Sequence, residues 1–237
     1  MKKVGLLGGM SWESTQLYYK LINQGVNRYL GGLHSAEIIL YSVDFARVEK
    51  LQKNGDWQEA GQLLAEAARC LESAGADCIL ICTNTMHKVA KSVVMSVDIP
   101  LLHIADAVAE ILLNKKITKV GLLGTAFTME QDFYREYIQD KYGVTVIVPD
   151  SPDRAAVHKI IFEELCKGVL LDSSRELYLQ VIDRLSAQGA EAVILGCTEI
   201  GLLVSQDNVT VPLLDTTQIH ASKAVKYALS DSQTFST

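Results

Sequence analysis

The chain has 237 residues, five cysteines and a formal net charge of −6 at pH 7. The negative charge and the absence of a long Lys/Arg run argue against nucleic-acid binding, and no apolar stretch reaches the length of a membrane span or a signal-peptide core. The odd number of cysteines, without disulfide spacing, is typical of free thiols in a reducing compartment. We therefore expect a cytoplasmic protein that binds neither nucleic acid nor membrane.

Short apolar runs alternate along the chain with segments of helical periodicity, which predicts an α/β fold with parallel sheets and helices on both faces. The first half is expected to hold strands at 4–8, 37–43, 78–82 and 101–104, and helices starting at the cap Ser11, at 57–74, from 86, and up to 113. The second half is expected to hold strands at 120–124, 144–148, 192–196 and 211–214, and helices at 129–141, 157–166, 175–185 and from 218. The polar tail after residue 230 is expected to fray.

The two halves repeat each other. The sequence VGLLG occurs at 4–8 and 120–124, a Gly-Ala-acid triplet at 75–77 and 189–191, and a Pro-Leu-Leu triplet at 100–102 and 212–214. These segments keep one order and offsets between 112 and 116 residues, so the sequence predicts a duplicated α/β unit.

Polar residues follow two equivalent strands of this repeat. Cys197 follows the strand at 192–196, and at the repeat offset Thr83, after 78–82, corresponds to it. Because ligands bind beyond the carboxyl ends of parallel strands, both residues are predicted to lie at strand tips in a ligand site. A pseudo-twofold arrangement would place Thr83 opposite Cys197.

This pair is suited to proton transfer at a carbon atom. The thiolate of Cys197 is favoured at a helix N-terminus and can act as a base, while the hydroxyl of Thr83 can donate a proton from the opposite face. The N–H groups of the residues after each tip, Asn84, Thr85, Thr198 and Glu199, form a site for a carboxylate.

Simpler interpretations stay open for single residues. A lone cysteine at a strand end is usually a small buried hydrophobe, and only the repeat favours a catalytic Cys197. His87 either orients a site residue or is a structural histidine, and Glu199 either assists acid–base chemistry or is a charge at a helix start. The Gly8-Gly9-Met10 turn lacks dinucleotide-binding spacing, and no metal-ligand spacing occurs.

The motifs resemble the aspartate/glutamate racemase family. The similarity rests on Gly8-Gly9-Met10, on Thr-Asn-Thr-Met-His at 83–87 and on Gly-Cys-Thr-Glu at 196–199. The family uses two opposed cysteines without a cofactor or metal, but Thr83 stands in the first cysteine position here. That replacement resembles the branch specific for L-aspartate and L-glutamate. Cys82, one residue earlier, is expected to point to the other face of its strand.

The resemblance implies two pseudosymmetric Rossmann-like domains with the active site in the cleft between them. The first would comprise 1–98 and 210–237 and the second 99–209, and the protein would be a homodimer. Catalytic residues would be Thr83 and Cys197, with His87 and Glu199 assisting. Substrate contacts carried over by position are Met10, Gln52, Asn84, Thr85, Thr125, Thr128 and Thr198.

The implied reaction is removal of the α-proton of an acidic L-amino acid by Cys197 and reprotonation by Thr83. Other reactions known for related folds stay open, namely hydantoin racemisation and maleate isomerisation. A protein that binds an acidic amino acid without catalysis is the alternative from a different class.

Overall fold

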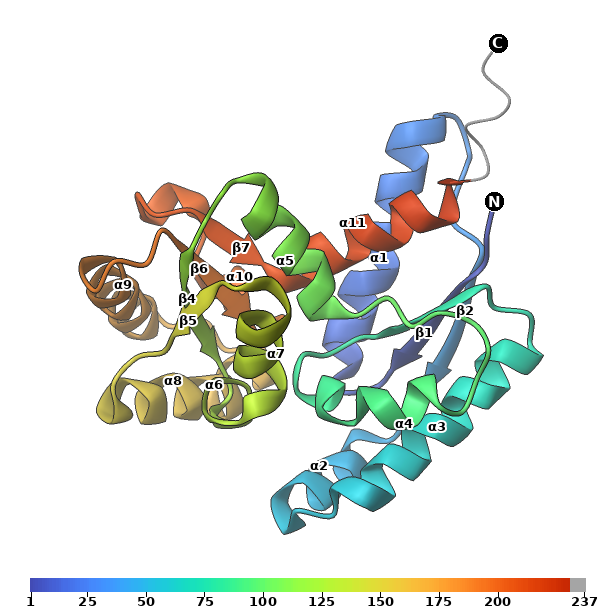
Figure 1. The fold of residues 1–237 in the computed structure, drawn as a ribbon, viewed down its shortest axis with the longest axis horizontal. Coiled ribbons are helices and arrows are strands. Elements are labelled where there is room, and N and C mark those ends of the chain that lie inside the picture. The colour runs from blue at the N-terminus through green and yellow to red at the C-terminus, as the bar shows by residue number, and fades with distance from the viewer. Residues whose placement is uncertain (231–237) are drawn as a thin grey trace. The chain divides into compact units, whose positions relative to one another are not determined.

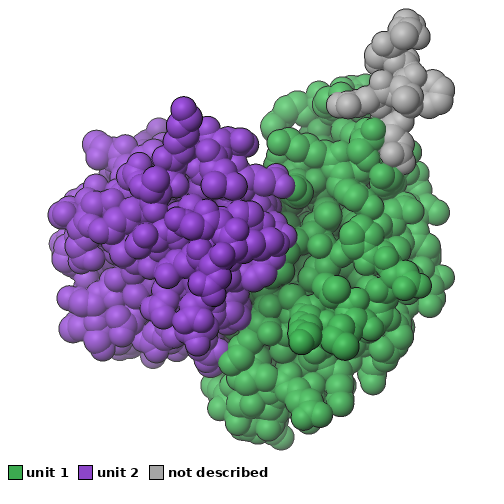
Figure 2. Space-filling view, in the orientation of Figure 1, with its two compact units in different colours: residues 1–104, 217–237 green, residues 105–216 purple. Residues whose placement is uncertain are grey.

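A computed structural model describes residues 1–230 of the chain. The fold is α/β and divides into two compact units (Figures 1 and 2). Unit 1 comprises Met1–Ile104 together with the chain from Thr217 on, and unit 2 comprises Ala105–Thr216. Among the described helices, none has the length and apolar character needed to cross a membrane.

Unit 1 is built on a three-stranded parallel sheet of order β2-β1-β3. β1 is central: Val4 and Leu6 pair with Ile38 and Leu40 on one side, and β3 pairs on the other. The elements of this unit are β1 (Val4–Gly8), α1 (Trp12–Leu30), β2 (Ile38–Ser42), α2 (Phe45–Asn54), α3 (Trp57–Ser73), β3 (Cys78–Ile81), the 3-10 helix η1 (Thr85–Val89), α4 (Ala90–Val94) and α11 (Thr216–Ala228), whose first residue still belongs to unit 2.

Alternating residues of these strands face two separate apolar clusters. Leu6 and Leu80 pack with residues of α1 and α11, whereas Leu7 and Ile81 pack with residues of α2 and α3. Burial of each such side chain contributes on the order of 2 kcal/mol, so the helices on both faces hold the central strands in place. The carboxyl ends of β1 and β3 remain at one edge of this rigid sheet.

Unit 2 is built on a four-stranded parallel sheet of order β5-β4-β6-β7. β4 and β6 are central, and β6 is buried along its whole length. The elements are α5 (Ile104–Asn114), β4 (Lys119–Gly124), α6 (Ala126–Glu130), α7 (Asp132–Tyr142), β5 (Thr145–Ile147), α8 (Ser151–Glu163), η2 (Leu165–Lys167), α9 (Asp172–Ala187), β6 (Ala192–Gly196), α10 (Ile200–Leu203), η3 (Gln206–Asn208) and β7 (Leu213–Asp215).

The repeat seen in the sequence extends to individual hydrogen bonds. The backbone N–H of Asp77 donates to Lys3 in unit 1, and that of Glu191 donates to Lys119 in unit 2. The glycines before these acids, Gly75 and Gly189, both have φ of 91°. These matching hydrogen bonds and φ values at corresponding positions of the repeat confirm that the two units are duplicates of one α/β arrangement.

The repeat differs at its fourth strand, and this corrects the expected strand at 101–104. In unit 1 only an isolated bridge joins Leu101 to Ile79, because the following backbone groups, Leu102 O and Ile104 N, bond histidine side chains instead of a neighbouring strand. In unit 2 the equivalent segment is β7, which pairs with β6.

The boundaries of the units also differ from the expected ones, because hydrogen bonds assign two segments to the other unit. β7 hydrogen-bonds to β6 and therefore belongs to the second sheet, whereas we expected the strand at 211–214 in the first domain with 210–237. The chain passes from unit 1 to unit 2 at 104/105 rather than at 98/99, since the 99–104 segment is hydrogen-bonded to β3 and to helices of unit 1.

Two helical segments also differ from expectation. The expected helix at 129–141 is two helices, α6 and α7, because Gln131 between them is extended, with φ of −96° and ψ of 153°. α2 was not predicted, since only two of its ten residues, Val48 and Leu51, are buried and apolar. Residues 231–237 of the expected frayed tail lie outside the described part.

Candidate functional site

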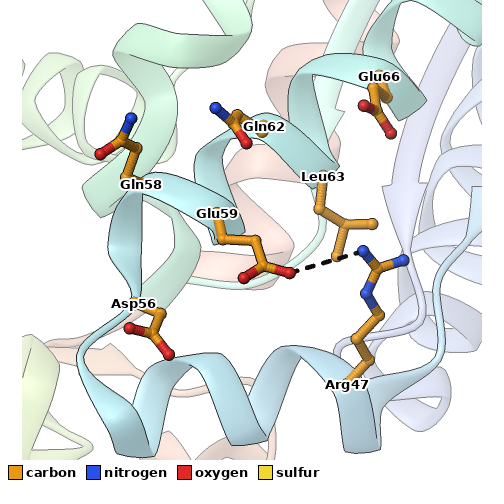
Figure 3. A pocket seen from close by; sticks show the side chains of 7 residues that line it. All are labelled: Arg47, Asp56, Gln58, Glu59, Gln62, Leu63 and Glu66. Carbon is orange, nitrogen blue, oxygen red and sulfur yellow. Dashed lines mark ion pairs between the residues drawn. The ribbon is translucent and has the colours of Figure 1, made fainter.

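A surface pocket lies between α2 and α3, but it does not contain the residues that the sequence singled out (Figure 3). Its charged lining consists of Asp56, Glu59 and Glu66 with Arg47, which is ion-paired with Glu59 at 3.9 Å. The excess of carboxylates disfavours an anionic ligand there. The strand tips of each unit are therefore the stronger candidates.

The first tip follows β1 in unit 1. Gly9 has φ of +88°, and a Cβ at this position would collide with the backbone of Val43, so the turn requires glycine. The N–H of Gly9 donates to Thr15 Oγ1 at 2.8 Å, and Ser11 caps α1, as expected, by accepting from Ser14 N at 3.2 Å. The turn thus holds Met10 buried at the start of the helix.

The second tip of unit 1 follows β3. Within residues 78–87, Thr83 is the one side chain that keeps partial exposure, since all its neighbours in this stretch are buried. Cys82 is fully buried and packs with Tyr18 and Ile22 of α1, which confirms that it points to the other face of the strand. Burial raises the pKa of the Cys82 thiol, so Cys82 is a core residue rather than a second acid–base group.

Gln52, a predicted substrate contact, is hydrogen-bonded to the segment that follows this tip. Gln52 on α2 is buried, and its Nε2 donates to the sulfur of Met86 at 3.0 Å. Met86 and Met10 belong to the same apolar cluster. Asn84 and Thr85 are buried where η1 begins, with Asn84 at the cap position.

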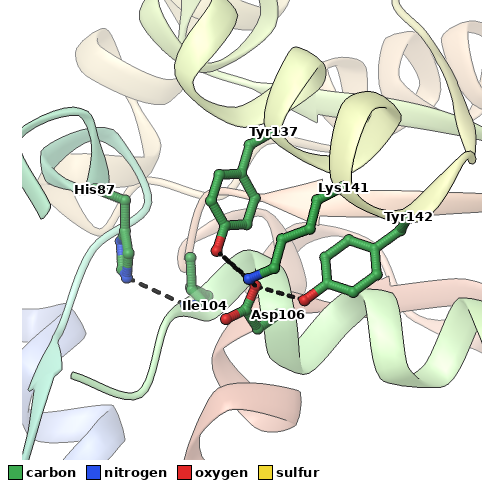
Figure 4. Close-up of polar contacts among 6 residues, drawn as sticks. All are labelled: His87, Ile104, Asp106, Tyr137, Lys141 and Tyr142. Atoms are coloured by element: carbon green, nitrogen blue, oxygen red, sulfur yellow. Dashed lines mark hydrogen bonds and ion pairs between the residues drawn. The ribbon is translucent and has the colours of Figure 1, made fainter. Parts of the chain in front are cut away.

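His87 lies one turn beyond Thr83, and both nitrogens of its ring are hydrogen-bonded. Its Nδ1 lies 2.8 Å from the carbonyl oxygen of Thr83, and its Nε2 accepts from the backbone N–H of Ile104 at 3.2 Å (Figure 4). Because a carbonyl can only accept, Nδ1 carries the proton and Nε2 is the unprotonated acceptor. Burial and the neighbouring imidazoles of His103 and His220 lower the pKa of His87 well below its usual range.

The equivalent tip of unit 2 follows β6. Cys197 alone keeps partial exposure within residues 192–200. Its Sγ donates to Oε2 of Glu199 at 3.0 Å, and Oγ1 of Thr198 donates to the same oxygen at 2.5 Å. Burial, and then the Glu199 carboxylate, raises the pKa of the Cys197 thiol well above its usual range. The thiol is therefore protonated here, and the Glu199 carboxylate accepts its hydrogen bond.

Two threonines after β4 complete the surroundings of this tip. Thr125 caps α6 by accepting from Thr128 N at 3.3 Å, and the two hydroxyl oxygens lie 3.2 Å apart. The methyl group of Thr128 lies 3.3 Å from where a Cβ on Gly196 would be. Both threonines are buried directly beside the strand end that carries Cys197.

The helices that follow the two tips are short, as expected for the one that begins near Met86. η1 is a 3-10 helix of five residues, and α10 has four residues with Glu199 at its cap position. So few aligned peptides add little to the field of the first N–H groups. The backbone N–H of Glu199 lowers the pKa of the Cys197 thiol, but burial and the Glu199 carboxylate raise it by more.

Two residues beside the tips carried no signal in the sequence. Ser14 donates from its Oγ to the carbonyl oxygen of Cys82 at 2.8 Å, although the two are 68 positions apart. Tyr178 on α9 is fully buried and belongs to the apolar cluster against which Cys197 packs. Only the folding of helices onto the sheet brings either residue to its tip.

Comparison with known proteins adds independent findings. The family model of Asp/Glu/hydantoin racemases matches residues 7–224. A crystal structure of a candidate Asp/Glu racemase from Yersinia pestis is 57% identical, covers 97% of this chain and 100% of that one, and superposes with a TM-score of 0.92.

An aspartate racemase homologue from Pyrococcus horikoshii is 37% identical, with coverage of 96% and 99% and a TM-score of 0.84. The broad specificity amino-acid racemase RacX of Bacillus subtilis is 23% identical over 226 residues, which are 94% of this chain and 96% of RacX. The match of the family model over most of its length shows that this chain belongs to the Asp/Glu/hydantoin racemase family.

Proposed function

We propose that this racemase acts on L-aspartate and L-glutamate without pyridoxal phosphate or another cofactor. Cys197 removes the α-proton, and Thr83 supplies a proton to the opposite face of the same carbon. The backbone N–H groups after the two residues bind the α-carboxylate, together with the side chains of Asn84, Thr85 and Thr198. Met10, Gln52 and Thr125 complete the substrate contacts.

One observation carries this proposal. At each of two strand tips related by the internal repeat, a single residue keeps partial exposure within a buried stretch, and these residues are Thr83 and Cys197. A residue that takes or gives a proton must reach the substrate while its neighbours exclude water. The two tips offer one hydroxyl and one thiol, which is an unequal acid–base pair.

Glu199 supplies what Cys197 needs to act as a base. The S–H proton passes to the Glu199 carboxylate 3.0 Å away, which leaves a thiolate and a carboxylic acid. The thiolate then takes the α-proton, so the C–H bond breaks and the S–H bond forms again. Thr83 gives its hydroxyl proton to the carbanion and recovers one from solvent, and Glu199 releases its proton to solvent, which restores the starting state.

The test is proton NMR of L-aspartate and L-glutamate with the protein in deuterated water. We expect loss of the α-proton signal and formation of the D-enantiomer. Cys197→Ala should abolish both, because no base remains on that face. Cys70→Ala, which changes an exposed cysteine on α3, is the matched control and should behave as the native protein.

Full retention of α-proton exchange in Cys197→Ala would refute the assignment. Binding of aspartate in a calorimeter without any exchange by the native protein would instead indicate a non-catalytic binding protein. Hydantoin and maleate are included as substrates, and turnover of either in preference to the acidic amino acids would overturn the proposed substrate class. A homodimer stays a prediction that sedimentation equilibrium tests.

A further inference from the structure

The backbone on both sides of the Thr83 side chain is held by side chains from elsewhere in unit 1. Ser14 Oγ donates to the carbonyl oxygen of Cys82 at 2.8 Å, and His87 Nδ1 donates to the carbonyl oxygen of Thr83 at 2.8 Å. The two peptide groups that fix the orientation of the Thr83 Cα–Cβ bond are therefore both anchored. Cys197 has no equivalent histidine, since Gly201 stands where the repeat places His87.

His87 is itself anchored to the start of α5. Its Nε2 accepts from Ile104 N at 3.2 Å (Figure 4). A ring that donates from Nδ1 to a carbonyl and accepts at Nε2 from an amide must be neutral and in one tautomer. The imidazole thus acts as a rigid spacer between the Thr83 peptide and the 102–104 segment.

A second buried histidine holds the same segment from the other side. His220 on α11 lies with Nε2 2.6 Å from the carbonyl oxygen of Leu102 and with Nδ1 2.9 Å from the hydroxyl of Tyr18. The carbonyl requires the proton on Nε2, so Tyr18 donates to Nδ1 and His220 has the opposite tautomer to His87. The two rings lie 5.8 Å apart at 64°.

We propose that His87 is a positioning residue that holds the Thr83 hydroxyl at its reacting position, and that His220 braces the segment to which His87 is tied. This inference rests on the proposed function. The physical reason is that a proton donor works only in a narrow range of positions, and a displacement of about 1 Å can cost on the order of 100-fold in rate.

The proposal is distinguishable from a purely structural role by how the carbanion partitions. A structural histidine would change the amount of folded protein, which scales every rate alike. A positioning histidine changes reprotonation by Thr83 but not proton removal by Cys197. In deuterated water the proton that Cys197 has taken exchanges with solvent deuterium. A carbanion that Thr83 fails to protonate then receives deuterium from the Cys197 face, which gives deuterated L-substrate.

The experiment measures the ratio of deuterated L-substrate recovered to D-product formed from L-glutamate or L-aspartate. His87→Gln loses the donor at the Nδ1 position and keeps a polar group near Nε2. His87→Asn keeps a donor near Nδ1 and loses the contact with Ile104. Thr83→Val, which removes the hydroxyl at nearly constant shape, sets the upper limit of the ratio.

We expect His87→Gln to raise this ratio by at least about tenfold over the native protein, toward the value for Thr83→Val. His87→Asn should raise it by less than His87→Gln, because the tie to Thr83 remains. His34→Gln and His34→Asn, at an exposed histidine, are the matched controls and should leave the ratio unchanged. The ratio does not depend on the folded fraction, so partial unfolding of a variant does not obscure it.

An unchanged ratio in His87→Gln, with racemisation by the native protein intact, would overturn the positioning role alone. Absence of exchange and of D-product with the native protein would overturn the proposed function and this inference with it. An equal rise in His87→Asn and His87→Gln would also overturn the inference, because it would show that the bond to Thr83 is not what matters.

Discussion

Cys197 lies in surroundings that oppose its ionisation. It packs against an apolar cluster of unit 2, and its thiol faces the Glu199 carboxylate at 3.0 Å. Burial and a nearby negative charge both disfavour a thiolate, so the mechanism that we propose generates the base at the moment of reaction. The carboxylate that raises the pKa of the thiol is also the group placed to accept its proton.

Glu199→Gln tests this pairing. The amide keeps the size of the side chain and can accept a hydrogen bond from Cys197, but it cannot take up the thiol proton. We expect kcat to fall by about 100-fold, with a much smaller change in KM, because a general base is lost. Steady-state kinetics of racemisation measures both.

The control is Glu163→Gln on α8, where an exposed carboxylate pairs with Lys159 at 3.8 Å. It should leave kcat unchanged. A Glu199→Gln variant within about threefold of the native kcat would mean that Glu199 only starts a helix, which was the simpler interpretation of its sequence position.

The pairing of an alcohol, Thr83, with a thiol, Cys197, predicts different initial rates with the L- and D-enantiomers. An alcohol is a far weaker acid than a thiol, so Thr83 can donate a proton to a carbanion but is a poor base toward the D-substrate. Thr83→Cys should raise the initial rate with D-aspartate or D-glutamate by at least about tenfold, measured by polarimetry. No gain would argue against Thr83 as the second acid–base residue.

The strands fix the positions of Thr83 and Cys197, and the residues directly after the strands supply the neighbouring polar groups. β3 and β6 are buried along their length and belong to rigid parallel sheets, so the residues directly after them have fixed positions. Individual backbone groups at the tips then bond side chains from helices, as Cys82 O bonds Ser14. Elements of this kind tolerate little movement, which suits proton transfer.

The start of α5 is held within unit 2 by one carboxylate. Asp106 Oδ1 accepts from Tyr137 and Tyr142, each at 2.7 Å, and from Lys141 at 2.9 Å (Figure 4). All three donors come from α7. This cluster therefore joins α5 to α7 and has no ligand role in our proposal.

Asp106→Ala should remove that link and lower the free energy of unfolding. Hydrogen bonds to a charged group contribute about 1.5–3 kcal/mol, but the Asp106 side chain is 30% exposed, so we expect a loss of about 1–2 kcal/mol. Urea denaturation measures it. Glu110→Ala on the same helix, at an exposed position, is the control, and an equal loss in both variants would contradict the role of Asp106.

At the scale of the whole molecule, two neutral buried histidines link stability to pH. Burial lowers the pKa of His220 to about 3, and His87 is shifted in the same direction. Histidine in the unfolded chain has a pKa of about 6.5, so below that pH the unfolded state binds a proton that the folded state does not. The contribution to stability is complete above pH 6.5 and is lost as the pH falls toward 3.

We expect His220→Gln to reduce the slope of the free energy of unfolding against pH between pH 6.5 and 4 by about 1.4 kcal/mol per pH unit. The groups that face His220 are Tyr18, His103, the ring of His87 and the Leu102 carbonyl, and they are unchanged in this variant. Urea titrations at several pH values give the slope. An equal slope in the native and variant proteins would contradict a neutral His220 in the folded state.

The α/β class, the duplication and the two tips follow from the sequence alone. Apolar periodicity reports local burial, and the offset of 114 residues between the two Gly-Ala-acid triplets aligns Thr83 with Cys197, so neither result needs a three-dimensional contact. That Cys82 faces the core also follows from strand alternation alone.

The groups that surround the tips became known only from the folded structure. Whether the 101–104 segment forms a strand depends on His220, which is 118 positions from its partner Leu102. That the Cys197 thiol faces the Glu199 carboxylate depends on the direction of a turn that periodicity does not encode. Such contacts are long-range or depend on side-chain direction, and for that reason they arise only when the helices have packed on the sheets.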